Sequence, residues 1–321
     1  MNEWLWGTEW IVALQSATGG ALDGLMASFS FFGTEMFYLL VMPAILWCYD
    51  AGLGIRTGVL LLGGSSLNAT LKLALGLPRP FWVDPAVQAP QPESSFGLPS
   101  GHAQNAVAVW GYLAYRLRRW WATVLAIVLI LGISLSRPYL GVHFAADVLA
   151  GWVVGGIVLL VYLLVEAPVA QWLRRQQLAV RLIAAGVGSI SLVVIGGLVY
   201  QAVMDRTVPA EWIENYLRAV PDAEGFEALS PSGLIGAAGA LFGFALGAVL
   251  LDAWGRFDAR RGDGWRKVTR FVVGVLGVLA LFMGLAAVFP EGEMFRYLRY
   301  ALVGFWIAYG APRAFGVLRI G

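Results

Sequence analysis

The sequence predicts an all-α membrane protein, a polytopic bundle of about nine transmembrane helices. Of its 321 residues, 59% are hydrophobic and only 13% are charged, a balance that soluble globular domains do not have. Apolar runs such as "WATVLAIVLILGI" and "GWVVGGIVLLVYLLV" are long enough, with their flanks, to cross a hydrocarbon core of about 30 Å. The alternating pattern of membrane strands is absent from the sequence, so helices are expected.

The N-terminal segment "MNEWLWGTEW" is expected to lie at the membrane surface as part of the mature chain. It contains two glutamates and no basic residue, so it lacks the positive region that begins a cleaved secretory signal. Trp4, Trp6 and Trp10 favour the headgroup level because their rings are amphipathic. The single cysteine, Cys48, excludes an internal disulfide and a site of several thiolates.

The apolar runs predict nine spans, which puts the two ends of the chain on opposite sides of the membrane. The predicted spans are residues 31–49, 54–76, 103–117, 120–138, 144–165, 181–203, 232–253, 267–289 and 294–317. On this layout fifteen of the 22 Lys and Arg residues lie on one side, which the positive-inside rule makes cytoplasmic. We therefore expect a multi-pass protein of the plasma or inner membrane, with its N-terminus outside and its C-terminus in the cytoplasm.

The polar motifs divide the chain into two regions. Residues 1–180 contain all of these motifs, whereas residues 181–321 are expected to add about four spans without catalytic residues. Within the seventh span a glycine at every fourth position, at 239, 243 and 247, predicts close helix contact inside the chain rather than a dimer interface. The acidic segment 204–231 is compatible with a short interfacial helix and equally with a solvated loop.

The first of three polar clusters, "KLALGLPRP", is suited to an anion. Lys72 and Arg79 are seven residues apart, about two helical turns, and Pro78 and Pro80 are expected to end the helix and turn the arginine inward. Lysine supplies a point charge, and arginine supplies a planar fork that matches phosphate oxygens. Taken alone, the pattern is better explained by two side chains that snorkel to the membrane surface.

The second cluster, "FGLPSGHAQN", combines a tight turn with the start of a helix. Pro99 and Gly101 shape the turn, and the free N–H groups of the helix together with the Ser100 hydroxyl can bind an anion beside His102. The alternative is a simple helix cap by Ser100. A second Pro-Ser-Gly at 231–233 is followed by leucine instead of histidine, and we interpret that copy as a cap only.

The third cluster, "SRPYLGVHFAAD", places an arginine, a histidine and an aspartate close together. His143 and Asp147 are four residues apart and share a helical face, so the carboxylate can accept from one ring nitrogen and leave the other free. Arg137 can close over the same point across the bend at Pro138. A histidine that merely bonds a neighbour is the alternative, but both histidines of the chain fall in such clusters.

The three clusters lie on the same predicted outer face of the membrane, and their chemistry fits phosphoryl transfer. The transferred group needs fixed donors for its equatorial oxygens, with a nucleophile and an acid at the apical positions. We assign His143 as the nucleophile that forms a phosphohistidine, Asp147 as its activator, and His102 as the acid that later activates water. The expected phosphate ligands are Lys72, Arg79, Arg137, the Ser100 hydroxyl and the Gly101 N–H. No cluster of carboxylates is expected at this face, so no metal and no other cofactor are expected.

The trio Lys72-x6-Arg79-Pro80, Pro99-Ser100-Gly101-His102 and Arg137-x5-His143-x3-Asp147 resembles the three-part signature of the type 2 phosphatidic acid phosphatase superfamily, which also includes the vanadium haloperoxidases. The resemblance covers about residues 54–165. It implies a six-helix core, a metal-independent histidine mechanism and vanadate as a phosphate mimic. The overall layout is also similar to glucose-6-phosphatase.

The resulting expectation is a membrane phosphatase that hydrolyses a lipid phosphate monoester or diphosphate. The alternatives are a sugar phosphate hydrolase of the glucose-6-phosphatase kind, a protein that binds or transports phosphate headgroups without cleaving them, and, least favoured, a haloperoxidase. The expected partners are the lipid phosphate substrate and membrane lipids, and no nucleic acid is expected. The leaving group and the oligomeric state do not follow from the sequence.

Overall fold

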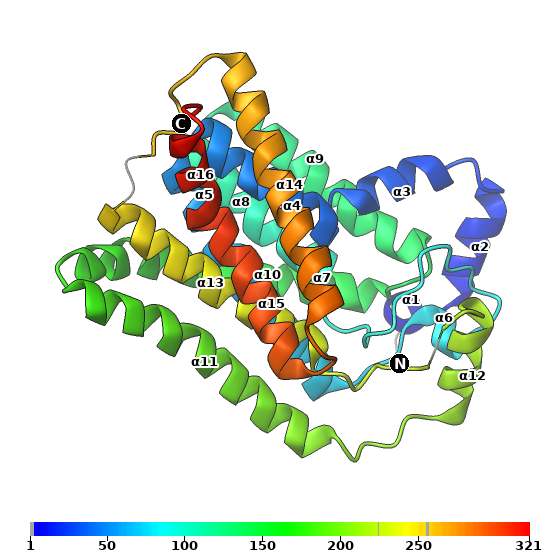
Figure 1. The fold of residues 1–321 in the computed structure, drawn as a ribbon. Helices are drawn as coiled ribbons and strands as arrows, with labels where there is room; N and C mark the ends of the chain where they lie inside the picture. The colour runs from blue at the N-terminus through cyan, green and yellow to red at the C-terminus, as the bar shows by residue number, and fades with distance from the viewer. Residues whose placement is uncertain (1–2, 224, 255–256) are drawn as a thin grey trace. The chain divides into compact units, whose positions relative to one another are not determined.

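The computed structural model describes residues 3–223, 225–254 and 257–321, and this part of the chain is helical with no β-strand (Figure 1). The first helices are α1 (Glu3–Trp6), α2 (Glu9–Thr18), α3 (Asp23–Phe31), α4 (Glu35–Ala44), α5 (Ala51–Leu75), α6 (Pro80–Val83), α7 (Gly101–Asn105), α8 (Gly111–Leu117) and α9 (Trp120–Tyr139). They are followed by α10 (Ala145–Arg174), α11 (Leu178–Val203), α12 (Ala210–Ala219), α13 (Ser232–Trp254), α14 (Gly264–Val288), α15 (Glu293–Phe305) and α16 (Ala311–Val317). Three π-helical turns, η1 (Ile45–Tyr49), η2 (Ala106–Trp110) and η3 (Trp306–Gly310), continue α4, α7 and α15.

Each of the nine predicted spans is mostly helical, but the count of nine membrane spans is not confirmed. Within the described residues, six helices are long and apolar enough to cross a membrane, or seven if α3 and Glu35–Tyr49 form one span. The segment Gly101–Leu117, for example, has 17 helical residues, which reach about 25 Å and fall short of a hydrocarbon core of about 30 Å. The chain is an integral, multi-pass membrane protein with at least these long apolar helices.

The chain forms two compact units that interleave in sequence. One comprises Met1–Glu35, Leu67–Leu160 and Gly196–Pro231, and the other comprises Met36–Ser66, Val161–Ile195 and Ser232–Gly321. All three polar clusters belong to the first unit. The predicted division into residues 1–180 and 181–321 describes where the motifs lie along the sequence, whereas the two units are defined by contacts in space. The division therefore stays a prediction.

In the first unit, an aromatic cluster joins the segment after α5 to the acidic segment. The short helix α6 lies beside α12 (Figure 1), and the buried Trp82 ring packs on Phe226 with centroids 4.8 Å apart. The Asn215 amide on α12 donates to the Trp82 carbonyl at 2.9 Å. Residues 210–219 are therefore helical, which decides between the two alternatives for the acidic segment in favour of a short helix.

The start of α7 is packed closely against α10. A Cβ atom on Gly151 would lie 2.7 Å from the Ser100 carbonyl oxygen, and one on Gly155 would lie 2.5 Å from the Gln104 carbonyl oxygen. Contacts this short leave no room for a side chain, so the two glycines let the helices approach backbone to backbone. The second and third polar clusters are thereby held against each other.

In the second unit, α13 packs along α15 through the predicted glycine stripe. A Cβ atom on Gly239 would lie 2.4 Å from the Tyr297 carbonyl oxygen, and one on Gly243 would lie even closer to the Ala301 carbonyl oxygen. The close helix contact predicted from this spacing is confirmed, and it is made within the chain. Nearby, the fully buried Arg270 donates to the Ile320 carbonyl at 2.5 Å and so ties α14 to the C-terminal residues.

Candidate active site

The structure brings the three polar clusters together inside the first unit. Lys72 lies in the last turn of α5, Arg79 just before α6, and Ser100, Gly101 and His102 at the start of α7. Arg137 lies near the end of α9, His143 in the following loop, and Asp147 in the first turn of α10. Every predicted site residue is buried except Gly101 and His102, which are partly exposed.

Arg79 forms the centre of the hydrogen-bond network. Helix α5 ends at Leu75, because Gly76 turns the chain with a φ of +62°, and this turn carries Arg79 back toward the end of the helix. The guanidinium donates to the Ser95 carbonyl at 2.6 Å, the Val142 carbonyl at 2.8 Å and the Phe96 carbonyl at 3.3 Å. Three backbone carbonyls therefore hold the Arg79 guanidinium in place, and the guanidinium also brings a positive charge to the site.

The geometry around His143 defines which of its nitrogens carries the proton. Nδ1 lies 3.1 Å from Oδ2 of Asp147, and Nε2 lies 3.1 Å from a guanidinium nitrogen of Arg79. Because a guanidinium can only donate, Nε2 must accept, and the proton is on Nδ1 facing the carboxylate. Burial, and then the charge of Arg79, hold the pKa of His143 well below its usual range. The result is a neutral imidazole with an oriented lone pair on Nε2.

Asp147 is fixed so that it can orient the histidine. Its Oδ2 also accepts from the Phe144 N–H at 2.9 Å, and its backbone carbonyl accepts from the Ser100 N–H at 3.0 Å. One residue thus holds His143 through its side chain and the Pro-Ser-Gly-His turn through its backbone. Asp147 therefore fixes the positions of both histidines of the site relative to each other.

Ser100 caps α7, so the cap that the sequence left as an alternative is present. Its backbone is extended, and its hydroxyl accepts from the Ala103 N–H at 3.5 Å. The His102 side chain is 17% exposed, and its Nε2 is a buried atom with no hydrogen-bond partner in the part of the chain that the structure describes. A cap does not exclude anion binding, because the hydroxyl and the first N–H groups of the helix still lie at the site.

Arg137 contributes the second guanidinium. One of its nitrogens donates to the Ser30 hydroxyl on α3 at 2.6 Å. Its Nε is buried and has no hydrogen-bond partner among the described residues. An unpartnered N–H of this kind leaves a donor available at the site.

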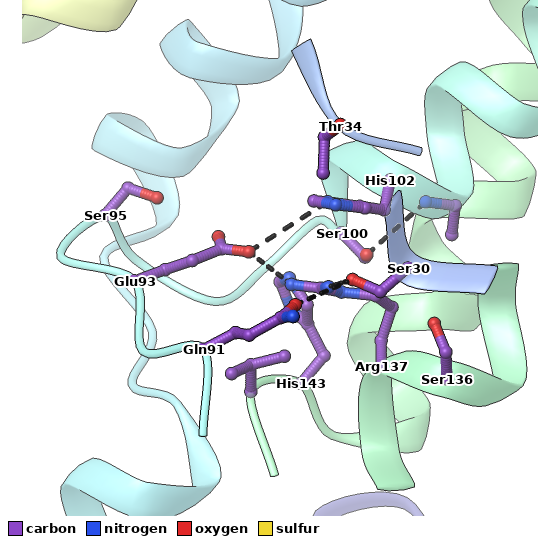
Figure 2. Close-up of polar contacts among 12 residues, drawn as sticks. Ser30, Thr34, Gln91, Glu93, Ser95, Ser100, His102, Ser136, Arg137 and His143 are labelled. Atoms are coloured by element: carbon purple, nitrogen blue, oxygen red, sulfur yellow. Dashed lines mark hydrogen bonds and ion pairs between the residues drawn. The ribbon is translucent and has the colours of Figure 1, made fainter. Parts of the chain in front are cut away.

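The sequence analysis missed Glu93, whose carboxylate lies between the two arginines. Oε2 is 2.6 Å from Arg79. Oε1 pairs with Arg137 and is also 4.0 Å from Nδ1 of His102 (Figure 2). Burial raises the pKa of Glu93, but Arg79 and Arg137 lower it, and the net result is a pKa well below the usual value. Glu93 is therefore a second carboxylate at the site beside Asp147, which was the one carboxylate named from the sequence.

Two further residues that the sequence analysis passed over support the site. Ser95 accepts from the Lys72 ammonium and from Arg79, at 3.0 Å each. The buried Asn68 donates to the Pro99 carbonyl at 3.2 Å and to the Gln104 side chain at 2.9 Å. Asn68 precedes Lys72 by one helical turn, and this i,i+4 spacing was a signal in the sequence.

Two family models match the chain. The model described as "PAP2 superfamily" matches residues 53–169, and the model described as "PAP2 superfamily phosphatase, transmembrane extension" matches residues 235–321. The first match contains all three polar clusters and agrees with the extent of the resemblance predicted from the motifs.

Three curated relatives carry names that refer to lipid phosphates. "Lipid phosphate phosphatase delta" of Arabidopsis thaliana is 26% identical over 53% of this chain and 45% of its own length. "Phosphatidylglycerophosphatase B" of Bacillus subtilis is 38% identical over 31% of this chain and 50% of its own length. "Undecaprenyl-diphosphatase" of Sulfolobus acidocaldarius is 29% identical over 42% of this chain and 66% of its own length. The matched region thus spans about half the length of the first two relatives. No solved structure gives a significant match.

Proposed function

Because this chain belongs to the PAP2 superfamily, we propose that it is an integral membrane phosphatase that hydrolyses a lipid phosphate monoester or diphosphate through a phosphohistidine. The observation that carries the proposal is the state of His143. Its Nδ1 faces Asp147, and its Nε2 lone pair faces the guanidinium of Arg79, which shares the Glu93 carboxylate with Arg137. A nucleophile in this state needs no prior loss of a proton.

In the first step the terminal phosphate binds to Arg79, Arg137 and Lys72, with the Gly101 N–H and the Ser100 hydroxyl as further donors. Nε2 of His143 attacks phosphorus, so that a P–N bond forms while the P–O bond to the lipid breaks. His102 donates a proton to the leaving oxygen. The fixed positive charges stabilise the charge that develops on the equatorial oxygens.

In the second step water replaces the histidine on phosphorus. His102, now neutral, accepts a proton from the attacking water, the P–O bond forms and the P–N bond breaks. Inorganic phosphate and His143 are regenerated. The proposal includes no metal ion, since three basic side chains supply the positive charge. We place the site at the extracytoplasmic face, on the basis of the uneven Lys and Arg distribution in the sequence.

Lipid phosphates are the proposed substrates because the names of three relatives refer to such compounds. The test is a phosphate-release assay of the purified full chain against phosphatidate, phosphatidylglycerol phosphate, a polyprenyl diphosphate, a sphingoid phosphate and glucose 6-phosphate. We expect release from at least one lipid at a rate well above that from the sugar. Preference for glucose 6-phosphate would refute the lipid substrate class, and phosphate binding without any release would indicate a headgroup-binding protein.

The roles of the two histidines are separated by the leaving group. We expect His143→Ala to abolish turnover of lipid phosphates and of p-nitrophenyl phosphate. His102→Ala is expected to slow lipid turnover by about 10²–10⁴-fold, because general acid catalysis contributes that much, but to spare p-nitrophenyl phosphate, whose leaving group needs little protonation. Full turnover in the His143→Ala variant, or loss of activity with a chelator that magnesium restores, would contradict the mechanism.

A further inference from the structure

The loop 84–100, which we call the strap, passes over the basic residues of the site and is anchored on both sides of Glu93. On the N-terminal side, the Gln15 amide donates to the Gln88 carbonyl at 2.8 Å and accepts from the Gln88 N–H at 3.0 Å. On the C-terminal side, the Gly97 N–H donates to the Leu77 carbonyl at 2.8 Å. The backbone around Glu93 is therefore held while its side chain reaches inward.

The Glu93 carboxylate occupies the position that the proposed mechanism requires for phosphate. One oxygen binds the guanidinium of Arg79. The other binds Arg137 and lies near His102 (Figure 2). Arg79 in turn contacts Nε2 of His143, so the carboxylate is linked to the proposed nucleophile through this arginine and lies beside the proposed acid. A phosphate bound to the same two guanidinium groups would have to displace it.

The arginines do not depend on Glu93 for their positions. Arg79 keeps its bonds to the Ser95, Val142 and Phe96 carbonyls, and Arg137 keeps its bond to Ser30. The Glu93 side chain is 29% exposed, whereas both arginine side chains are at most 1% exposed. Of the three side chains only Glu93 is partly exposed, so Glu93 is the one that can turn away toward solvent.

We propose that Glu93 is a tethered competitor for the phosphate site, bound to both arginines in the empty protein and released when a terminal phosphate binds. This inference rests on the proposed function only for the location of the phosphate site. Because the carboxylate is attached to the strap, its effective concentration at the site is high, in the millimolar range or above. Every incoming anion must overcome this competition.

The competition weakens the binding of every anion by the same factor, so that only the stronger ligands, the terminal phosphates, still fill the site. A monoester or diphosphate terminus presents three free oxygens and up to two negative charges, whereas a phosphodiester presents two free oxygens and one charge. The diester therefore offers the two arginines no more than the Glu93 carboxylate already does. The phospholipids that make up a bilayer are mostly diesters, and Glu93 would keep their headgroups from filling the site.

The test is the affinity of the purified full chain in detergent for inorganic phosphate, measured by calorimetry. If Glu93 occupies the site 90–99% of the time, Glu93→Gln should bind phosphate about 10–100-fold more tightly, because the competent fraction is no longer limiting. A short-chain phosphatidylglycerol, which is a diester, should gain affinity by a similar factor. Glu214→Gln, on the exposed face of α12, is the matched control and should bind like the wild type.

Glu93→Asp separates competition from a simple effect of charge. Aspartate keeps the negative charge but is one methylene shorter, and with the strap anchored it cannot span both arginines. Competition predicts tighter phosphate binding in this variant too, whereas a pure charge effect predicts wild-type binding. Unchanged or weaker phosphate affinity in both variants would overturn the proposal. Because binding is measured without turnover, a wild-type protein that binds phosphate but releases none would refute the proposed function and leave this proposal standing.

Discussion

Replacement of Asn68 by alanine tests whether helix α5 holds the Pro-Ser-Gly-His turn in place. The side-chain amide of Asn68 donates to the Pro99 carbonyl and to Gln104, and Asn68 is only 6% exposed. Removing a buried donor costs about 1–3 kcal/mol for each acceptor that loses its partner, so we expect the free energy of unfolding to fall by about 2–6 kcal/mol. Turnover should fall by up to about 10²-fold, because a shift of about 1 Å in a catalytic group has that effect.

The free energy of unfolding can be measured by titration with sodium dodecyl sulfate in mixed micelles, followed by tryptophan fluorescence. A double-mutant cycle with Gln104→Ala should show that the two substitutions are not additive, with a coupling of about 1 kcal/mol. Gln201→Ala, on an exposed part of α11, serves as the control. A loss below about 0.5 kcal/mol for Asn68→Ala, the range of ordinary surface substitutions, would refute the reasoning.

Two further predictions concern the packing and the ionisation of the site. A Cβ atom on Gly33 would lie 2.6 Å from Cδ2 of His102, so Gly33→Ala should displace the imidazole. We expect the free energy of unfolding to fall by about 1–3 kcal/mol and kcat to fall by a larger factor than KM rises. Wild-type kinetics in this variant would contradict the reasoning. The pKa of Glu93 is well below its usual value in the folded protein. Its ion pairs therefore contribute their full stabilisation at pH values above the pKa of an unfolded glutamate, about 4.3. This stabilisation decreases as the pH falls from there through the pKa of the folded state. The difference in stability between wild type and Glu93→Gln should therefore be constant from pH 5.5 to 8 and shrink under more acidic conditions, and a difference that grows on acidification would contradict the assignment.

Hydropathy located every long helix, but it could not decide how many of them cross the membrane. Mean hydropathy reports how apolar a segment is, whereas crossing also depends on its unbroken length. The segment Gly101–Leu117 is short, with 17 helical residues, and the last helical segment carries charged residues such as Arg296 and Arg299 near its start. The exact ends of a helix depend on local contacts, which mean hydropathy does not record.

The site was partly predictable from spacing in the sequence. His143 and Asp147, at i and i+4, meet as expected, but they do not share a helical face, because His143 lies in the loop before α10 and only Asp147 is in the helix. The convergence of the three clusters was predicted by placing them on one membrane face. Glu93 was not predictable in the same way, because it lies in a 17-residue loop without periodicity and its contacts depend on how the strap is anchored. The direction of the Glu93 side chain is set only when the loop folds, so the spacing to Ser100 in the sequence does not predict it.

The orientation of the Ser95 hydroxyl is set by the two basic groups beside it. Its oxygen accepts from the Lys72 ammonium and from the Arg79 guanidinium, so both lone pairs are engaged. Two positive charges on the oxygen polarise the O–H bond and strengthen the hydrogen as a donor. The positive end of the hydroxyl dipole points away from both basic groups, and the strap therefore presents an oriented dipole at the rim of the site where an ordinary serine would present a freely rotating one.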